Sequence, residues 1–177
     1  RGYVDRWGRC VMATVIRGSD NFDTAYAKSV AVIADVKAYN VGGGAFTGGA
    51  WQTRDLNTEL DDPENIVTIA SNQFTLQAGT YLVEWSAPAI QVNRHRSRLQ
   101  NITDSTTEAE GTSEYTTSSN TITNKSIGAC IVTIVSAKAF EVQHYCDTTN
   151  SNGFGINSNL SSQNSVYTLV KIHKIGA

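Results

Sequence analysis

The chain has 177 residues, of which 40% are hydrophobic and 17% charged, and its formal net charge is -2. This length suits one well-buried domain rather than two. The charge balance excludes the basic surface that binding to nucleic acid or to an anionic membrane requires. No run approaches the roughly 18 apolar residues that span a bilayer, and no signal-peptide pattern is present. The sequence begins with Arg1 rather than Met, so we expect it to be a processed or excised piece of a longer protein.

The first 28 residues contain aromatic side chains such as Trp7 and Phe22 but show no sustained hydrophobic period. We expect residues 1–28 to form an irregular N-terminal lead-in that docks on the rest of the chain or on a neighbouring subunit. Residues 29–177 then form the folded domain. Its first predicted strand is Ser29–Tyr39. The apolar residues on one face of that strand are Val30, Val32, Ala34, Val36 and Ala38.

The segment Phe74–Ala89 is the clearest β pattern in the chain. A turn at Gly79 is followed by a strand in which Tyr81, Val83 and Trp85 alternate with more polar residues. A period of two places one set on the core face of a half-buried strand and the other set outward. The other strands predicted in the first half are Trp51–Thr58, Ile66–Ile69, Phe74–Leu76, Thr80–Ala89 and Gln91–Ile102, with an acidic turn at Leu60–Asn65.

The second half of the chain repeats this organisation around longer loops. The polar stretch Asp104–Lys125 predicts one ragged strand around Tyr115 between exposed loops. Ile127–Val135 is apolar on both faces, which is typical of a strand buried on two sides. The remaining predicted elements are the strand Phe140–Cys146, a Gly/Asn/Ser loop at Asp147–Asn164 and a last strand at Val166–Ile175.

About eight short strands separated by Gly, Asn and Ser turns predict an all-β protein, an antiparallel β-sandwich or jelly roll. No segment of the domain shows a convincing helical period.

Three cysteines, Cys10, Cys130 and Cys146, are too few and too odd in number for a disulfide framework. A hairpin turning near Ala137 would bring Cys130 opposite His144, with Cys146 as a diagonal neighbour about 7–8 Å away, too far for an unstrained bridge. We therefore predict three reduced, buried thiols. A metal site made from Cys130, His144 and Cys146 would lack both the CxxC spacing and a fourth ligand.

Arg94, Arg96 and Arg98 recur at every second position and so lie on one face of a strand. No aromatic residues interleave with them in the sequence, as stacking on nucleic acid bases would require. We interpret them as a solvated strand face.

Four carboxylates lie close together in the acidic turn and offer oxygen ligands to calcium; they are Glu59, Asp61, Asp62 and Glu64. A dedicated calcium loop has a turn glycine and a terminal bidentate Glu. Pro63 favours an ordinary acidic turn instead. Calcium at a subunit interface remains the alternative, and no other metal or cofactor is predicted.

Catalysis requires a nucleophile, a base and an orienting group that converge in a pocket. The candidate bases are His95, His144 and His173, and no nucleophile elbow, HExxH pair or carboxylate dyad accompanies them. We expect a protein that is not an enzyme. The alternative is a hydrolase of polysaccharides.

Carbohydrate binding uses exposed aromatic faces with nearby amides. Tyr115 and Phe154, in the two polar stretches, are the best-placed aromatic residues, and Asn152 and Asn157 lie near Phe154. These four residues are the predicted ligand-binding set. The competing interpretation is that each aromatic ring folds back to anchor its own loop.

Three segments together resemble the complement/tumour-necrosis-factor jelly-roll superfamily. They are FTLQAGTYLVEWSAPA, with the pattern Phe-x-x-x-x-Gly-x-Tyr of that family's central strand, the segment IVTIVSAKAFEVQHYC, and the closing strand SVYTLVKIHKIG. The resemblance covers roughly Val30–Ile175. It implies a TNF-like jelly roll that assembles as a homotrimer around a three-fold axis.

A tighter resemblance is to jelly-roll virion proteins of tailed phages and prophages. It rests on the runs WQTRDLNTELDDPENIV, RHRSRLQNI, GTSEY and FEVQHYC. This likeness implies a phage virion part, such as a tail fibre tip that attaches to a host-surface glycan or protein. Other virion proteins would then bind through the lead-in. The alternatives are a capsid decoration, cement or connector protein, and a polysaccharide hydrolase carried on the fibre.

Overall fold

The computed structural model describes residues 3–4, 10–11, 29–119 and 121–176, and these contain strands but no helix. Two short strands near the start of the chain, β1 (Tyr3–Val4) and β2 (Cys10–Val11), pair with each other. The expected docking of the lead-in otherwise falls outside the described residues. Within the described part of the chain, no helix is long and apolar enough to cross a membrane.

Two antiparallel sheets make up the domain. The five-stranded sheet has the order β11-β8-β13-β3-β5, and the six-stranded sheet has the order β10-β9-β12-β7-β6 with β4 paired to β12. The strands of the first sheet are β3 (Val30–Lys37), β5 (Thr58–Asp61), β8 (Gly79–Ile90), β11 (Thr123–Ile134) and β13 (Ser165–Gly176). Those of the second are β4 (Gln52–Thr53), β6 (Val67–Ala70), β7 (Gln73–Leu76), β9 (Asn93–Asn101), β10 (Thr106–Thr116) and β12 (Lys138–Cys146).

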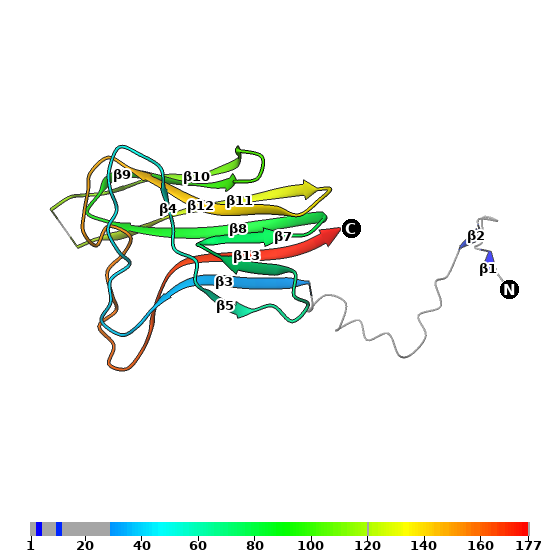
Figure 1. Ribbon diagram of the computed structural model, residues 1–177, viewed down its shortest axis with the longest axis horizontal. Coiled ribbons are helices and arrows are strands. Elements are labelled where there is room, and N and C mark those ends of the chain that lie inside the picture. Colours follow the sequence, from blue (N-terminus) through cyan, green and yellow to red (C-terminus); the bar gives the residue numbers. More distant parts are fainter. Residues whose placement is uncertain (1–2, 5–9, 12–28, 120, 177) are drawn as a thin grey trace.

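Strands that follow one another in sequence often lie in different sheets. The chain crosses from β8 to β9 and from β11 to β12, and within the five-stranded sheet β13 lies between β8 and β3. This order is that of a jelly roll, which confirms the predicted fold class. Figure 1 shows the loops of residues 38–50 and 147–164 at one end of the sandwich, which we call the loop end. The C-terminal end of β13 and the start of β3 lie at the other end.

The core lies between the sheets and follows the predicted alternation. Tyr81, Val83 and Trp85 of β8 are buried, whereas Glu84 between them is exposed. From the facing sheet, Phe140 packs on Phe74 with ring centroids 5.6 Å apart. Because one face of each strand supplies the whole core, the period of two in the sequence predicts these residues directly.

The buried residues of β3 are Ala31, Ile33, Ala34 and Asp35, and of these Ala31 and Ile33 belong to the main hydrophobic core. Most of the apolar set at even positions, including the half-buried Val30 and Val32, therefore lies on the outer face of the sheet. Both faces of β3 are apolar, and the outer one is a first sign that this sheet face is not an ordinary solvated surface.

The predicted strand Trp51–Thr58 is wrong in extent. The segment contains only the short strand β4, and the next strand, β5, extends into the predicted acidic turn. The turn itself begins at Asp62, whose carboxylate accepts hydrogen bonds from the backbone amides of Ile66 (2.9 Å) and Val67 (3.0 Å). An aspartate that binds its own downstream backbone in this way is a common turn device.

The stretch predicted to hold one ragged strand contains the eleven-residue strand β10, paired with β9. Its register shifts twice, between Thr107 and Ala109 and between Glu110 and Ser113. β10 is an edge strand whose side chains are mostly exposed. Because the side chains of β10 are exposed, its sequence does not alternate between apolar and polar residues, and the length of the strand could not be predicted.

The prediction that Ile127–Val135 is buried on two sides is wrong. Ile127, Ile131 and Val135 are 55%, 65% and 91% exposed, although Val132 points into the core. The physical reason is the lateral position of β11, which forms the edge of its sheet and is covered on its inner face only. The isolated chain therefore presents an apolar outer stripe.

The predicted hairpin near Ala137 is also wrong, because β11 pairs with β8 whereas β12 pairs with β9. Cys130 consequently lies opposite Val83, and Cys146 lies opposite His95. Both cysteines are free thiols, as expected, and burial raises their pKa, to about 11 for Cys130 and about 12 for Cys146. The third, Cys10, lies in β2, and the structure describes nothing of its side chain.

Gly128 is where the inner face of β11 accommodates the largest core side chain. A Cβ atom at this position would lie 2.0 Å from Cζ2 of the Trp85 indole. The indole is buried, and its Nε1 donates a hydrogen bond to Ser97 Oγ at 2.8 Å. Trp85 therefore has little room to move away from a larger residue at position 128.

We predict that Gly128→Ala destabilises the fold, by about 1–3 kcal/mol in the free energy of unfolding, because it overpacks this site. Urea denaturation followed by tryptophan fluorescence measures the change. The matched control is Ala70→Ser, which also adds one heavy atom but at an exposed position on β6 of the other sheet. It should change stability by less than about 0.5 kcal/mol. Equal stability of both variants would contradict the packing described here.

Candidate functional site

Two loops at the loop end are joined by backbone hydrogen bonds. Phe46 and Asn150 exchange N–H to O bonds of 2.9 and 3.0 Å, as two residues of a strand pair do. Gly43 N donates to Gly155 O at 2.9 Å. Segments a hundred residues apart in sequence are thus fixed against each other. This pairing makes the loop end a defined surface.

Arg54 lies beneath these loops and is completely buried. Its guanidinium donates to Thr168 Oγ1 (2.7 Å), to the carbonyl oxygen of Pro88 (3.0 Å) and to the carbonyl oxygen of Phe154 (2.9 Å). The guanidinium carbon also lies 4.0 Å from the centroid of the Phe154 ring. One side chain therefore connects the ends of β8 and β13 to the 147–164 loop.

Carboxylates near Arg54 offset part of the cost of burying its charge. Burial lowers the pKa of Arg54 to about 9, and the negative charges of Asp35 and Asp55 act in the opposite direction. Asp35 is itself buried, which raises the pKa of its carboxyl group, while Lys37 Nζ at 3.2 Å from Asp35 Oδ1 lowers it. Lys37 also pairs with Asp55.

A pair of buried histidines lies next to this network. His95 Nδ1 and His144 Nε2 are 3.0 Å apart and share one hydrogen bond. The outer nitrogens, His95 Nε2 and His144 Nδ1, have no hydrogen-bond partner. Burial lowers the pKa of His95 to about 4 and that of His144 well below 6.5, and the nearby Arg54 charge acts in the same direction. Both rings are therefore neutral near pH 7.

A groove opens at the surface of the loop end. It consists of two neighbouring hollows of about 150 and 400 Å³, which share Ile156 and Asn157 in their walls. We call it the loop-end groove. The smaller hollow is lined by Asn40, Gly42, Asn152, Ile156 and Asn157. The larger one continues along the starts of β11 and β13, past Thr123, Lys125, Ser158, Asn164 and Val166. The smaller hollow is mainly polar, whereas the larger one exposes more apolar than polar surface between its amides and hydroxyls. Among the described residues that line the two hollows, Lys125 is the charged one.

The structure brings together two of the four predicted ligand-binding residues. Asn152 and Asn157 both line the loop-end groove. Phe154 is only 7% exposed and packs on Phe46 with centroids 4.6 Å apart, so it anchors its loop from inside, as the competing interpretation held. Tyr115 is exposed on β10, and it does not line the groove.

Sequence reasoning missed other residues of this surface. Tyr39 is 43% exposed, and its hydroxyl donates to Asn159 Oδ1 at 3.5 Å. Its neighbour Asn40 has a positive φ of 60° and accepts a hydrogen bond from Asn157 Nδ2 at 2.6 Å. The only signal was the position of Tyr39 and Asn40 directly before a glycine-rich loop, where asparagine tolerates left-handed backbone.

The structure does not group the four carboxylates of the acidic turn as a calcium site within one chain. Glu59 and Asp61 belong to β5, while both carboxylate oxygens of Asp62 accept backbone amides. Among the residues that the structure describes, no three His, Cys, Asp or Glu side chains are grouped so that they could hold a metal. The same finding removes the set Cys130, His144 and Cys146.

The arginine face of β9 was predicted to be solvated, and the structure shows Arg94 exposed but Arg96 and Arg98 half-buried. Arg96 Nη1 lies 2.9 Å from Glu110 Oε2, and the strongly exposed Arg94 lies 3.5 Å from Asp147 Oδ2. An aromatic ring does accompany these residues in space, because Arg98 lies over the Trp51 ring at 4.1 Å. Trp51 directly precedes β4, which is distant from β9 in the sequence, so the spacing of residues along the chain could not reveal this contact.

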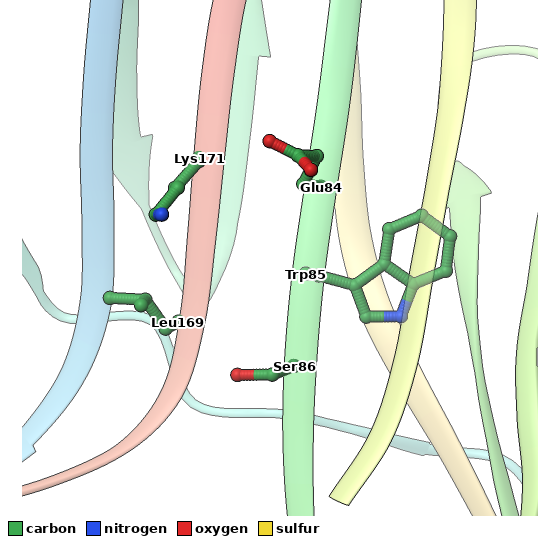
Figure 2. Close-up of a pocket in the computed structure, with 5 residues that line it drawn as sticks. All are labelled: Glu84, Trp85, Ser86, Leu169 and Lys171. Atoms are coloured by element: carbon green, nitrogen blue, oxygen red, sulfur yellow. The ribbon is translucent and has the colours of Figure 1, made fainter.

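The outer face of the five-stranded sheet is the second candidate surface. Register places Ile131, Leu82, His173 and Val30 in one row across four strands. A parallel row contains Glu84 and Lys171. Figure 2 shows Glu84 and Ser86 on β8 beside Leu169 and Lys171 on β13, around a shallow hollow of about 170 Å³, while Trp85 points toward β11. Apolar rows with an ionic row between them suit a specific protein contact.

The histidine pair makes stability depend on pH. We predict that the melting temperature falls as the pH is lowered from about 6.5 to 4. The unfolded histidines bind protons below their ordinary pKa, whereas the folded pair stays neutral until the pH reaches the lowered pKa of about 4 for His95. Each unit of difference corresponds to about 1.4 kcal/mol. Calorimetry across this range measures the effect.

The variant His95→Gln should flatten the pH dependence. The matched control, Thr68→Gln, changes an exposed residue of β6 that has no titratable group and should leave the slope unchanged. A slope that is the same in His95→Gln as in the parent chain would show that the buried pair does not cause it.

Solved structures similar to this chain share its jelly-roll fold. The globular domain of zebrafish complement 1qA protein matches with a TM-score of 0.54 and 14% identity over 84% of this chain and 98% of that chain. Murine APRIL at pH 5.0 matches with a TM-score of 0.55 and 10% identity over 83% of this chain and 98% of that chain. No protein-family model and no curated protein matches the chain. At such identities the likeness shows the fold alone, and that fold is the jelly roll of C1q and TNF-like domains.

Proposed function

We propose that the protein is a homotrimeric, non-enzymatic jelly-roll module of a tailed-phage virion, placed at a tail fibre tip where it attaches the particle to its host. The observation that carries the proposal is the exposed apolar outer face of the five-stranded sheet. The phage assignment is supported by the sequence likeness in the runs quoted above, and the trimer by the superfamily resemblance together with this face.

The outer face gives a physical reason for self-association. Ile127 and Ile131 of β11, with Val135 directly after it, form an exposed apolar stripe at the edge of the sheet. Exposed, apolar edge strands are a liability that proteins normally cover or charge. Charged residues on the same face, Glu84 and Lys171, would favour one register over another in a contact between copies. A head-to-tail contact of this kind closes into a ring when the rotation is 120°.

The ends of the domain suit attachment. The chain enters the sandwich at β3, at the end opposite the loop end. A module fixed to the particle through the segment before β3 would point its loops away from the particle. The loop end would then meet the host surface first.

A non-enzymatic role is supported by the positions of the histidines. His95 and His144 are buried as a neutral pair, and His173 lies beside Glu84 on the outer face, 3.7 Å from its carboxylate. None of the three lines the loop-end groove. The purified protein should therefore leave a host capsule intact, whereas loss of capsule would favour the hydrolase alternative.

We predict that Ile131→Glu reduces the mass in solution from trimer toward monomer. A buried carboxylate at each of three equivalent contacts would be desolvated without a partner. Multi-angle light scattering at micromolar concentration measures the mass. The control is Thr68→Glu, an exposed position on β6 of the other sheet, which should leave the trimer intact. A parent chain that is a stable monomer would contradict the proposed trimer.

Labelling of intact particles tests the location. Antibodies against the protein, viewed by electron microscopy, should mark the tail end. Signal spread over the head would instead assign the protein to capsid decoration or cement, and signal at the neck would assign it to a connector.

A further inference from the structure

We infer that the loop-end groove binds an acidic oligosaccharide of the host surface. The inference rests on the proposed attachment function and deepens it, because it names the site and the chemistry of the receptor. Three properties of the groove carry it: a fixed shape, a lining of amides and hydroxyls, and a single positive charge.

The shape of the groove is set by interactions beneath it. Gly43 is needed because a Cβ atom there would lie 2.8 Å from the backbone carbonyl of Phe154, and Gly155 is needed because a Cβ atom would lie 2.5 Å from the Tyr167 ring. The Tyr167 hydroxyl donates to the carbonyl oxygen of Val41 at 2.7 Å. A wall that is already ordered loses little conformational entropy on binding, which favours weak, hydrophilic ligands.

The side chains of the groove match the hydroxyl groups of a sugar. Each asparagine amide offers both a donor and an acceptor, as each sugar hydroxyl does. Asn40, Asn152 and Asn157 stand around the smaller hollow, with the half-exposed Ile156 as an apolar surface for the C–H groups of a sugar ring. Tyr39 immediately precedes Asn40 in the chain, and its side chain is partly exposed at this end of the sandwich. The groove thus combines polar orientation with apolar contact.

The charge of the groove selects an acidic sugar. Lys125 lines the larger hollow, and among the residues that the structure describes no aspartate or glutamate lines either hollow. A carboxylate on the ligand would form a charge-assisted hydrogen bond to the Lys125 ammonium group and would meet no like charge in the lining. A neutral sugar would gain no such contact.

A trimer would multiply a weak interaction. A three-fold rotation keeps every point at the same height along its axis, so the three loop-end grooves of a trimer face the same end. Repeating surface polysaccharides could occupy two or three grooves at once, and avidity then exceeds the affinity of one site by about 10²–10⁴-fold.

The test uses the full chain, fluorescently labelled, on an array of oligosaccharides from bacterial capsules and lipopolysaccharides, with neutral and uronic-acid-containing members. We expect binding to acidic members. Lys125→Gln should weaken that binding about tenfold or more, as loss of a hydrogen bond to a charged group does. Asn157→Ala should weaken it as well. Lys138→Gln, which removes a lysine paired with Asp104 at the opposite end of the sandwich, is the matched control and should bind like the parent.

Three outcomes would overturn the inference: no binding to any member, equal binding to neutral and acidic members, or acidic binding that survives Lys125→Gln. Measuring the mass of each sample in solution shows whether a negative result contradicts the binding site or the proposed trimer. If the protein is a trimer located at the tail end but binds no saccharide, the inference about the groove is wrong and the proposed function stands. A monomer that binds acidic saccharides supports the groove and contradicts the trimer.

Discussion

The buried charge of Arg54 is the constraint on which the loop end depends. A guanidinium with no exposure must keep its donors occupied, and three elements supply the acceptors through Thr168, Pro88 and Phe154. Because the last of these is a loop carbonyl, the loop cannot move away without leaving a buried donor unpaired, at a cost of several kcal/mol. A polar interaction inside the sandwich thus determines the shape of a surface outside it.

The same sandwich has two outer surfaces of opposite character. The six-stranded sheet exposes arginines that are paired with acids, such as Arg96 with Glu110, and such a face is stable in water. The five-stranded sheet exposes Ile127 and Ile131 along its edge. The inner core explains neither face, since the jelly roll would form with polar residues at these positions. This difference is the basis for proposing that copies of the chain cover the outer face of the five-stranded sheet.

The sequence predicted what a period of two can reveal. The core residues of β8 and β12 and the all-β class followed from alternation, because one buried face per strand leaves that mark. The order of strands within a sheet has no such signal in the sequence. For this reason two predictions were wrong: that Ile127–Val135 is buried on both faces, and that it forms a hairpin with Phe140–Cys146. At the site, Asn152 and Asn157 could be predicted from their loop. Tyr39 and Lys125 could not, because the fold alone brings them to the same end.

The central claim of this account is that the outer face of the five-stranded sheet is buried between copies of the chain. Sedimentation equilibrium of the unaltered protein, over a range of concentrations, tests it most directly. The account predicts a single species with three times the mass of the chain, which persists on dilution to micromolar concentration. A single species with the mass of one chain over the whole range would contradict it.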